Sequence, residues 1–408
     1  MVKKKLIVIG GGAAGFFCAV NAARLNKDLE VIIIEKSSKL LSKVKISGGG
    51  RCNVTNSCES ISSTAACYPR GEKFLKKAFH NFFTKDTISW FEDRGVKLKA
   101  EPDGRMFPVT DNSETIINCL LNEASEYNVN VLINRKVTGM HKRNNNFVLD
   151  LGDGSEMLCD FLCIAAGGFP KKDQFNWLIN TGHNIIDPVP SLFTFNIPKS
   201  KLSTLMGISL NAAIKISKTN LSQTGPLLIT HWGISGPAVL KLSALGARIL
   251  AECNYNFIIY INWLPEFNEN TLRNNILELR NQSGSQKIIN RNPFSIPSRL
   301  WEYFISEAGI NNEFRWAELP SKEQNKLIKI LTSSEFNVSG KTTFKEEFVT
   351  AGGIDLSEIN HNTMESKLMD NLYFAGEILD VDGITGGFNF QNAWTTGYIA
   401  AESISQKK

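Results

Sequence analysis

Short apolar runs alternate with helix-forming stretches at the start of the chain. Leu6–Ile9 is apolar and rich in β-branched residues, a glycine turn follows, and residues 13–25 have the composition of a helix. A second apolar run, Val31–Ile34, ends in Glu35. This order of strand, turn, helix and strand predicts a βαβ unit of about 30 residues, with parallel strands and a right-handed crossover.

The pattern changes twice further along the chain. Prolines at 188, 190 and 198 indicate a boundary near residue 191, and glycine-rich turns return after about residue 343. A chain of 408 residues has room for a large and a smaller domain. The apolar spacing predicts helices over 72–95, 112–127, 271–279 and 298–307, and strands over 129–150, 156–165 (with Asp153-Gly154 as a hairpin turn), 208–216, 256–263 and 372–375.

The first candidate site is the run Gly10–Gly15, which satisfies G-x-G-x-x-G directly after a strand and at the start of a helix. Gly10 permits the tight turn, Gly12 lets the backbone approach a pyrophosphate, and Gly15 lets the helix pack on the strand. Glu35 lies 20 residues beyond Gly15, where a carboxylate can accept hydrogen bonds from ribose hydroxyls. This fingerprint disfavours NADP and alone does not separate FAD from NAD.

Two further segments have the composition of cofactor contacts. Ser47–Asn56 combines a glycine run with Arg51, which suits a second contact with a diphosphate or a flavin edge. Its Cys52 has no resolving cysteine at short spacing, so we favour a packing role for this thiol. In the segment Asn371–Trp394 a strand ends at Gly376-Glu377. Further on, Gly386-Gly387 begins a helix that runs to about residue 403. The N-terminus of this helix would stabilise negative charge on a reduced flavin.

These three segments, with Ile164–Pro170 and Thr230–Pro237, resemble a bacterial flavoprotein family. Its members are named NAD(P)/FAD-dependent oxidoreductases, aminoacetone oxidases or, in one branch, bile-acid dehydro-intermediate reductases. The resemblance spans nearly the whole chain and implies an α/β fold: a Rossmann-type, glutathione-reductase-like FAD-binding domain with an inserted domain that covers the flavin. The implied FAD-binding parts are 1–190 and 343–408; the insertion over 191–342 is β-barrel-like at 191–266 and helical at 267–334.

The resemblance also implies where FAD lies. It implies pyrophosphate contacts at Gly10, Gly12, Ala14 and Gly15, the adenosine ribose at Glu35, adenine at Val137, Arg51 further along the cofactor, and Gly376, Glu377, Gly387, Phe388 and Asn389 around the ribityl chain and isoalloxazine. The further expected cofactor-binding residues are Ala13, Lys36, Gly50, Asn53, Ala166 and Gly167.

Several classes of function lack their signatures. Residues 130–350 hold no second G-x-G-x-x-G for a pyridine nucleotide, so we expect NAD(P)H to meet the flavin only transiently, if it is used. The chain lacks the Cys-x4-Cys of disulfide reductases, and its eight cysteines form no Cys-x-x-Cys pair or metal-like cluster with histidine. We therefore predict no metal site.

Charge and hydropathy restrict the partners and the location. The net charge of +5 comes from 45 basic and 40 acidic residues spread along the chain, which indicates no dedicated nucleic-acid patch. Lys3–Lys5 and the apolar residues after them resemble a secretory signal, but we interpret them as the first strand and its helix. No other apolar run reaches the length of a membrane span. We expect a cytoplasmic protein with no membrane association.

These features predict an FAD-dependent oxidoreductase that passes two electrons between the flavin and a small organic substrate. His231, one of only five histidines, is the candidate catalytic acid or base, although an imidazole bonded to backbone is the alternative. Three other functions stay open: an aminoacetone-like amine oxidase that uses dioxygen, a flavoprotein that modifies RNA, and a flavin-binding protein without catalysis.

Overall fold

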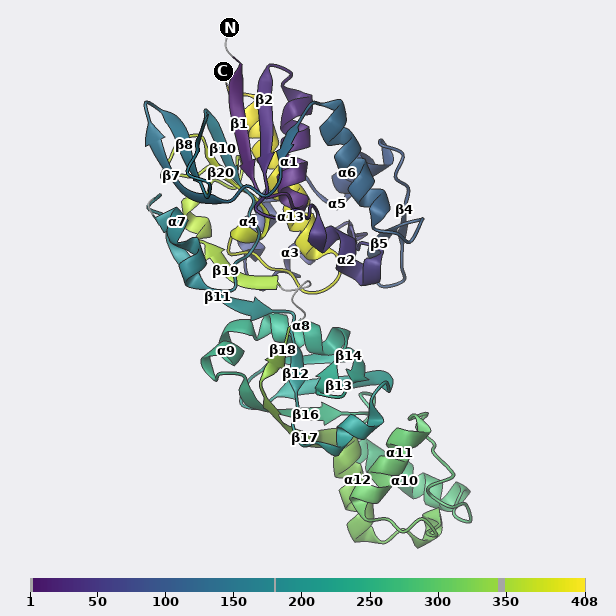
Figure 1. The fold of residues 1–408 in the computed structure, drawn as a ribbon. Coiled ribbons are helices and arrows are strands. Elements are labelled where there is room, and N and C mark those ends of the chain that lie inside the picture. Colours follow the sequence, from purple (N-terminus) through teal and green to yellow (C-terminus); the bar gives the residue numbers. More distant parts are fainter. Residues whose placement is uncertain (1–2, 180, 344–348, 408) are drawn as a thin grey trace. The chain divides into compact units, whose positions relative to one another are not determined.

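The computed structural model describes residues 3–179, 181–343 and 349–407. The chain divides into two compact units: the first unit comprises Met1–Ser191 and Phe344–Lys408, and the second unit comprises Leu192–Thr343. The first unit therefore contains both ends of the chain, drawn in purple and yellow in Figure 1. These boundaries differ by one residue from those predicted at 190/191 and 342/343.

A five-stranded parallel sheet forms the centre of the first unit. Its order is β20 (Leu372–Phe374), β10 (Phe161–Ile164), β1 (Lys4–Ile9), β2 (Leu29–Ile34) and β6 (Asn130–Leu132). Val8 of β1 pairs with Ile33 of β2 on one side and with Cys163 of β10 on the other. Leu6, Ile7 and Val8 are fully buried, as expected for a parallel strand that is covered on both faces.

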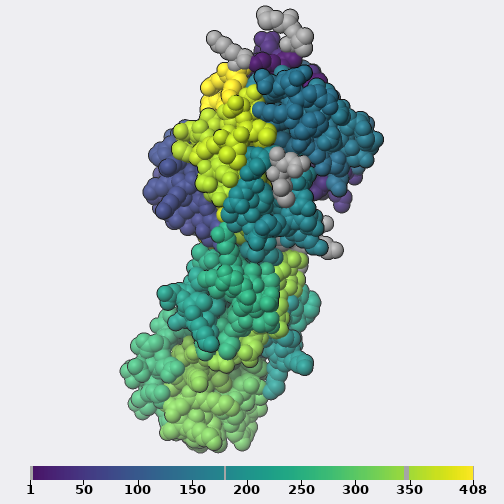
Figure 2. Space-filling model, turned by 90° about the vertical axis from the view of Figure 1, so that its left-hand side faces the viewer, coloured from purple at the N-terminus to yellow at the C-terminus, as the bar shows by residue number. Residues whose placement is uncertain are grey.

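Helices α1 (Ala13–Leu25) and α13 (Phe388–Ser405) pack closely against each other in the first unit. Gly397 permits this approach, because a Cβ there would lie 2.8 Å from the carbonyl oxygen of Ala14. Phe17 of α1 contacts Trp394 of α13 and Trp90, with ring centroids 5.1 and 4.6 Å apart. Burying side chains of this size contributes about 1.5–3 kcal/mol each. The N-terminal and C-terminal segments thus share one core, and Figure 2 shows the yellow C-terminal segment as part of the surface of this unit.

The rest of the first unit consists of short strands and helices. Three small antiparallel sheets are present, with the orders β3-β5-β4, β7-β8-β9 and β11-β19. The bounds are α2 (Ser42–Gly50), β3 (Thr55–Asn56), α3 (Ile61–Ala65), α4 (Glu72–Ala78), α5 (Thr84–Glu92), β4 (Leu98–Ala100), β5 (Arg105–Pro108), α6 (Glu114–Glu126), β7 (Val137–Arg143), β8 (Asn146–Leu151), β9 (Glu156–Cys159), α7 (Asn176–Ile179), β11 (Ile185–Ser191) and β19 (Val349–Ile354).

Three of the predicted elements are divided in the structure; one is the strand predicted over 156–165, which forms β9 and β10 in two different sheets. The helix predicted over 72–95 is two helices, α4 and α5, because Phe83 is extended (φ −124°, ψ −174°) and its amide is capped by the Asp86 carboxylate. The strand region predicted over 129–150 breaks at Asn144-Asn145, where both residues have positive φ and form the hairpin turn between β7 and β8. The predicted turn at Asp153-Gly154 connects β8 to β9.

The second unit has a seven-stranded antiparallel sheet with the order β17-β16-β13-β14-β15-β12-β18. Only Gly340 separates β17 from β18 along the chain, although they stand at opposite ends of this order. The sheet must therefore curl back on itself, as in a nearly closed barrel. Its bounds are β12 (Thr194–Asn196), β13 (Ser209–Ile216), β14 (Ser222–Ile229), β15 (Gly233–Ser235), β16 (Asn256–Asn262), β17 (Ser334–Ser339) and β18 (Lys341–Thr342).

Helices complete the second unit. α10 (Glu269–Gln282), α11 (Ser298–Ala308) and α12 (Ser321–Ser333) follow β16, and α8 (Pro237–Leu245) and α9 (Ala247–Glu252) precede it. Trp263, Trp301 and Trp316 are fully buried and form part of a core separate from that of the first unit. The last two strands, over 334–342, lie outside the range 191–266 in which the sequence predicted the barrel-like part. Among the residues described, no helix is long and apolar enough to cross a membrane.

Candidate cofactor-binding site

The turn from β1 into α1 is built from glycines that serve different purposes. Gly10 has φ +118°, and a Cβ there would collide with the carbonyl group of Ala165. A Cβ on Gly15 would collide with the carbonyl oxygen of Gly10, so Gly15 sets how closely the helix packs on the strand. A Cβ on Gly12, the N-cap of α1, would meet nothing within 4 Å. The space beside Gly12 is therefore open, while Gly10 and Gly15 are locked by packing.

The first turn of α1 presents its backbone amides at this open space. The first intrahelical bond runs from Phe16 N to Gly12 O (3.0 Å), so the amides of Ala13, Ala14 and Gly15 precede the regular helical pattern. These amides and the helix dipole favour a negatively charged group. This arrangement suits the phosphates of a dinucleotide.

Glu35 follows β2 and joins the glycine turn to the next loop. Its Oε2 accepts a hydrogen bond from Gly11 N (2.9 Å), and its Oε1 accepts from Ser37 N and Ser37 Oγ (both 2.9 Å). A carboxylate offers about four acceptor positions, so it retains capacity for a ribose hydroxyl. Lys36 next to it is exposed, and its Nζ lies 5.5 Å from the Phe169 ring centroid. Glu35 thus also shapes the protein, a role that the ribose prediction did not include.

The loop after β10 and the start of β7 lie in the same unit. Ala165 N bonds to Ile9 O (2.8 Å), so the chain that continues into Ala166 and Gly167 leaves the sheet next to β1. Gly167 has φ +73° and open space around its Cβ position. Val137 is half-buried at the first position of β7, opposite Leu151.

Arg51 is held by acidic side chains. Its Nη1 lies 2.7 Å from Glu101 and 3.6 Å from Asp111, and its guanidinium stacks 4.0 Å from the Phe107 ring centroid. The hydrogen bond with Glu101 raises the pKa of Arg51. Gly50 beside it has φ +85° and accepts a bond from Ser113 N (2.9 Å) at its carbonyl. Contact between Arg51 and a cofactor would require the guanidinium to share its charge with these carboxylates.

Cys52 is fully buried and has φ +62°. Burial raises the pKa of its thiol to about 12. A thiol with that pKa stays protonated at neutral pH and is a poor nucleophile. The geometry agrees with the packing role favoured from the sequence.

Residues 53–56 contact the start of α13, more than 300 positions further along the chain. The Asn53 side-chain amide, oriented to satisfy both its groups, accepts from Gly387 N (2.8 Å) and donates to Thr55 O (3.0 Å). Asn56 Nδ2 donates to Gly386 O (3.1 Å), and Tyr68 Oη donates to Phe388 O (2.6 Å). The second and third candidate segments therefore form one structural cluster.

Gly376 and Glu377 connect α1 to two other elements, β19 and α2. A Cβ on Gly376 would lie 2.7 Å from Cβ of Ala14, so this turn packs on the first turn of α1. Glu377 accepts a hydrogen bond from Thr350 N (2.9 Å) and forms an ion pair with Lys43 (2.5 Å). Sequence reasoning missed Lys43 and Thr350, because neither stands in a glycine motif.

Asn389 uses its side chain within the protein. Its Oδ1 accepts from Gly383 N (2.8 Å), and its Nδ2 donates to Gly383 O (2.9 Å). It therefore fixes the loop before α13, while its oxygen and its nitrogen each keep one further hydrogen-bonding position.

A buried ion pair that the sequence did not suggest supports the same loop. Arg70 bonds to both carboxylate oxygens of Asp382, and Ser191 Oγ donates to Asp382 Oδ2 (2.6 Å). Asp382 is fully buried; burial raises its pKa and the charge of Arg70 opposes that shift. Asp382 precedes Gly383, so the ion pair and Asn389 act on adjacent residues.

His231 lies in the second unit, in the turn between β14 and β15. It is exposed, and its ring packs edge-on against Trp232 with centroids 4.3 Å apart. Trp232 Nε1 donates to Thr194 Oγ1 (2.9 Å), which fixes the neighbouring ring. The predicted cofactor residues all belong to the first unit, so His231 is the one predicted site residue outside it.

The residues of the first unit fit a dinucleotide cofactor. The Cβ positions of Gly12, Gly50 and Gly167 meet no atom within 4 Å, so backbone can be approached at each. Thr350 Oγ1 is buried without a hydrogen-bond partner among the described residues, beside Gly168 and Glu377. No group of three or more metal-ligating side chains occurs in the described part of the chain.

Comparison with known proteins agrees with this geometry. Residues 4–403 match the family described as HI0933-like protein Rossmann domain. A ribosomal RNA dihydrouridine synthase of Haemophilus influenzae is 32% identical over 417 residues, covering 98% of each chain. A 3-dehydro-bile acid delta(4,6)-reductase of Clostridium scindens is 28% identical over 414 residues, again with 98% of each chain covered.

A solved structure shows the same fold. The 3-ketosteroid delta1-dehydrogenase of Sterolibacterium denitrificans, in complex with 1,4-androstadiene-3,17-dione, has a TM-score of 0.52 at 12% identity, and all of both chains is covered. The parallel sheet, the glycine turn and the acid after β2 define a Rossmann-type FAD-binding protein, which confirms the predicted fold class. The chain belongs to the HI0933-like family of FAD-binding, oxidoreductase-type proteins.

Proposed function

We propose that this protein is an FAD-dependent reductase that adds two hydrogens to the C5–C6 double bond of uridine in ribosomal RNA. The observation that carries the proposal is the 32% identity, over 98% of both chains, with a protein named ribosomal RNA dihydrouridine synthase. An alignment that runs through both units includes the cofactor site and the insertion together.

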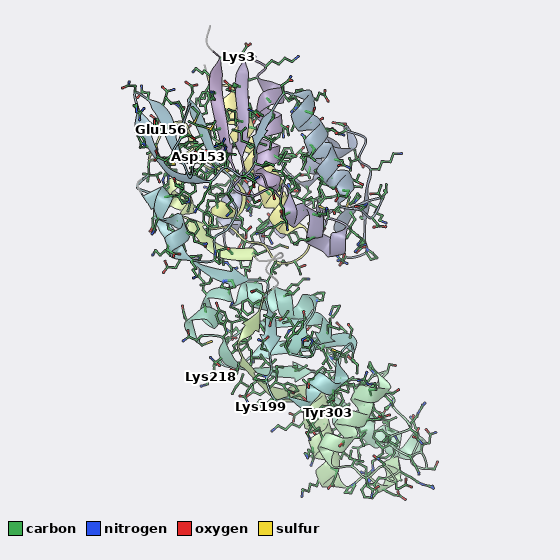
Figure 3. The ribbon with its side chains drawn as sticks, in the orientation of Figure 1. Lys3, Asp153, Glu156, Lys199, Lys218 and Tyr303 are labelled. Carbon is green, nitrogen blue, oxygen red and sulfur yellow. The ribbon has the colours of Figure 1, made fainter. Side chains whose placement is uncertain are left out.

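The distribution of charge between the units supports an RNA substrate. The second unit has 16 Lys and Arg against 10 Glu and no Asp, a net charge of +6; the first unit has 29 basic and 30 acidic residues, a net charge of −1. Lys199 and Lys218 are among the exposed lysines of the second unit (Figure 3). Proteins that bind RNA use such excess of Lys and Arg to contact phosphates. The even spread of charge along the whole sequence concealed this difference.

Several segments of the first unit would hold FAD. The amides of Ala13 and Ala14 would bind the diphosphate beside Gly12, and Glu35 would accept hydrogen bonds from the adenosine ribose. The N-terminus of α13 at Gly387 would stabilise negative charge at the pyrimidine part of the flavin. The Arg70–Asp382 pair and Asn389 would hold the loop before α13 in position.

The reaction balances as a two-electron reduction. The uracil ring takes up a hydride at one carbon of its double bond and a proton at the other. Reduced FAD, when bound, supplies the hydride, and a reduced nicotinamide nucleotide is the class of donor that replenishes its two electrons. His231 is the proposed proton donor, since an imidazole can deliver a proton near neutral pH.

A small unsaturated ketone is the second candidate substrate. The 28% identity with the 3-dehydro-bile acid delta(4,6)-reductase favours it, because that name also describes reduction of carbon–carbon double bonds. In both candidate substrates the double bond is conjugated with a carbonyl group. The same two-electron reduction would therefore act on either substrate.

Nucleoside mass spectrometry tests the proposal directly. The purified protein, loaded with FAD, is incubated with NADPH and ribosomal RNA that lacks dihydrouridine, and the RNA is then digested to nucleosides. We expect a product two mass units heavier than uridine that requires both FAD and NADPH. No such product, with turnover of a 3-oxo-4,6-diene steroid in parallel, would transfer the function to the second candidate.

A further inference from the structure

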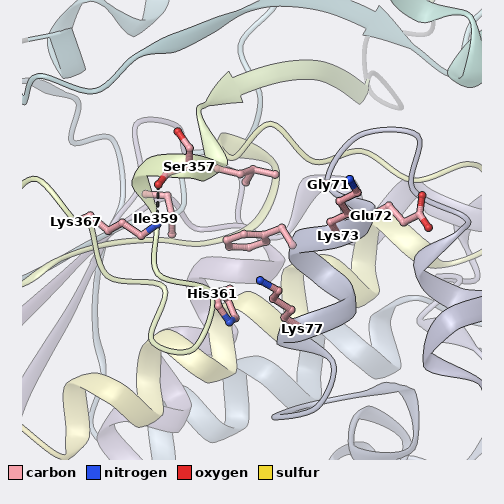
Figure 4. A pocket seen from close by; sticks show the side chains of 10 residues that line it. Gly71, Glu72, Lys73, Lys77, Ser357, Ile359, His361 and Lys367 are labelled. Carbon is pink, nitrogen blue, oxygen red and sulfur yellow. Dashed lines mark hydrogen bonds between the residues drawn. The ribbon is translucent and has the colours of Figure 1, made fainter.

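A cavity lies in the first unit between α4 and the segment that connects β19 to β20. Its volume is about 470 Å³, within the roughly 300–1,000 Å³ of typical ligand pockets. None of the residues assigned above to FAD contributes to it. The lining residues are Gly71, Glu72, Lys73, Phe74, Lys77, Leu356, Ser357, Ile359, His361 and Lys367 (Figure 4).

Three lysines give this cavity a positive charge. Lys73 and Lys77 are four residues apart on α4 and therefore share one face of the helix. Neither has a carboxylate partner in the part of the chain that the structure describes. Lys367 enters from the other wall, where its Nζ donates to Ser357 O (2.7 Å). Glu72 is the one acidic residue in the lining, so the cavity attracts anions.

His361 lies among these lysines. Burial and the positive charges of Lys77 and Lys367 lower its pKa. The imidazole is therefore neutral at physiological pH, and one of its nitrogens can donate a hydrogen bond to an anion. Figure 4 shows His361 and Lys77 on facing walls.

The remaining wall of the cavity is apolar. Phe74 is almost fully buried and packs edge-on against the His361 ring, with centroids 6.4 Å apart. Leu356 and Ile359 continue this surface. An apolar wall beside several ammonium groups fits a ligand that carries both a flat ring and a phosphate, whereas inorganic phosphate would leave the apolar wall unused.

We propose that this cavity is a second nucleotide-binding site, with the ligand's phosphate on Lys77 and Lys367 and its base against Phe74 and Leu356. The nucleotide is either part of an RNA strand or a free dinucleotide such as the nicotinamide donor. The RNA case rests on the proposed function, and the site itself does not.

Calorimetric titration of the FAD-loaded protein tests the site. The ligands are uridine 5′-monophosphate, a 5′-phosphorylated single-stranded RNA tetramer and NADPH, and the variants are Lys77→Glu and its matched control Lys76→Glu. Both substitutions change the same charge on the same helix, but Lys76 does not line the cavity. We expect uridine 5′-monophosphate to bind about tenfold or more weakly to Lys77→Glu, and with less than a twofold change to Lys76→Glu.

The relative affinities of the ligands identify the source of the nucleotide. Tighter binding of the RNA tetramer indicates a strand, and tighter binding of NADPH indicates the free dinucleotide. Equal binding by both variants, or no binding to the unmodified protein at millimolar ligand, would overturn the site. Because no turnover is measured, loss of the proposed RNA activity leaves this result intact.

A second readout measures binding in the unmodified protein, and a variant serves only to assign the resonances. In the unmodified protein, bound uridine 5′-monophosphate should shift the ring resonances of His361, assigned by their disappearance in His361→Asn. Unshifted His361 resonances in a sample that binds the ligand would place it elsewhere and overturn the proposal.

Discussion

The two units of this protein differ in net charge and in the groups they offer to a ligand. The first unit, with a net charge of −1, offers backbone at its predicted cofactor site: glycines at a strand end and the amides of two helix N-termini. The second unit, with a net charge of +6 and no aspartate, offers exposed basic side chains instead. A dinucleotide of fixed shape can be held by fixed backbone, whereas a long polyanion is attracted by many separate charges. In the proposed function, this difference would separate cofactor binding from substrate binding.

Two glycine substitutions separate folding from cofactor binding in the first unit. Gly15→Ala places a Cβ against the Gly10 carbonyl oxygen, so we expect a loss of stability of about 3 kcal/mol or more and a protein without FAD. Gly12→Ala meets no protein atom, so it should keep its melting temperature and lose FAD only. Thermal melts and flavin content measure both. A stable, FAD-loaded Gly12→Ala variant would contradict the position of the diphosphate.

The next largest effect concerns the buried pair Arg70–Asp382. Arg70→Met leaves a buried carboxylate without its cation and should cost about 3–5 kcal/mol. Because burial raises the pKa of Asp382 in the folded state, protonation favours folding, and the deficit should grow as pH rises through that pKa. Denaturant melts at about pH 5 and about pH 8 should show the larger loss at the higher pH. The double variant Arg70→Met/Asp382→Asn should lose that dependence; if it does not, another group causes it.

His231 lies in the second unit, so its loss should leave the first unit unchanged. His231→Ala should keep the flavin spectrum and slow turnover of RNA by about 10² or more if the imidazole delivers a proton. Stopped-flow measurement of flavin reoxidation by substrate isolates that step. Unchanged rates would show that the exposed ring serves only its packing against Trp232.

Glu35 has a structural role in the first unit and a predicted role in binding the ribose of FAD. Glu35→Ala should weaken FAD binding by about 1.5–3 kcal/mol through loss of ribose hydrogen bonds. Since its oxygens also accept from Gly11 N and Ser37 N, Glu35→Gln serves as the matched control that keeps one acceptor. Fluorescence titration with FAD gives the affinities. Equal affinity in all three proteins would exclude the ribose contact.

The smallest expected effect is on RNA affinity, and it tests the difference in net charge between the two units. Lys199→Glu/Lys218→Glu in the second unit should weaken RNA binding several-fold and reduce the salt slope by about 0.7 for each phosphate that is no longer neutralised. Lys27→Glu/Lys97→Glu, with the same change of charge on exposed sites of the first unit, should change affinity less than twofold. Similar weakening in both variants would mean that RNA responds only to net charge.

The fold could be predicted because its signals are local. The strand–glycine–helix order at residues 6–25 and the acid after the second strand depend on neighbouring residues alone, and the sheet and α1 confirm them. The prediction of one continuous helix over 72–95 was wrong, because Asp86 caps a new helix at Phe83. In a sequence, a single polar capping residue inside an amphipathic stretch looks like one more exposed residue of a continuous helix.

The site was harder to predict where it depends on long-range pairs. Arg70 meets Asp382 across 312 positions, and Lys43 meets Glu377 across 334, and neither pair leaves a spacing signal. Arg51 was expected at the cofactor from its charge beside a glycine run and Asn389 from the family resemblance, and their side chains bond to Glu101 and to Gly383. Sequence motifs predict the backbone of the site, and the side-chain partners required the three-dimensional structure.

The visible absorbance spectrum of the purified protein, recorded anaerobically, is the decisive measurement for an FAD-dependent reductase of RNA. We predict flavin bands that bleach when NADPH is added and return when ribosomal RNA lacking dihydrouridine is supplied. A protein that cannot be loaded with FAD, or a reduced flavin that ribosomal RNA leaves bleached, would contradict this function.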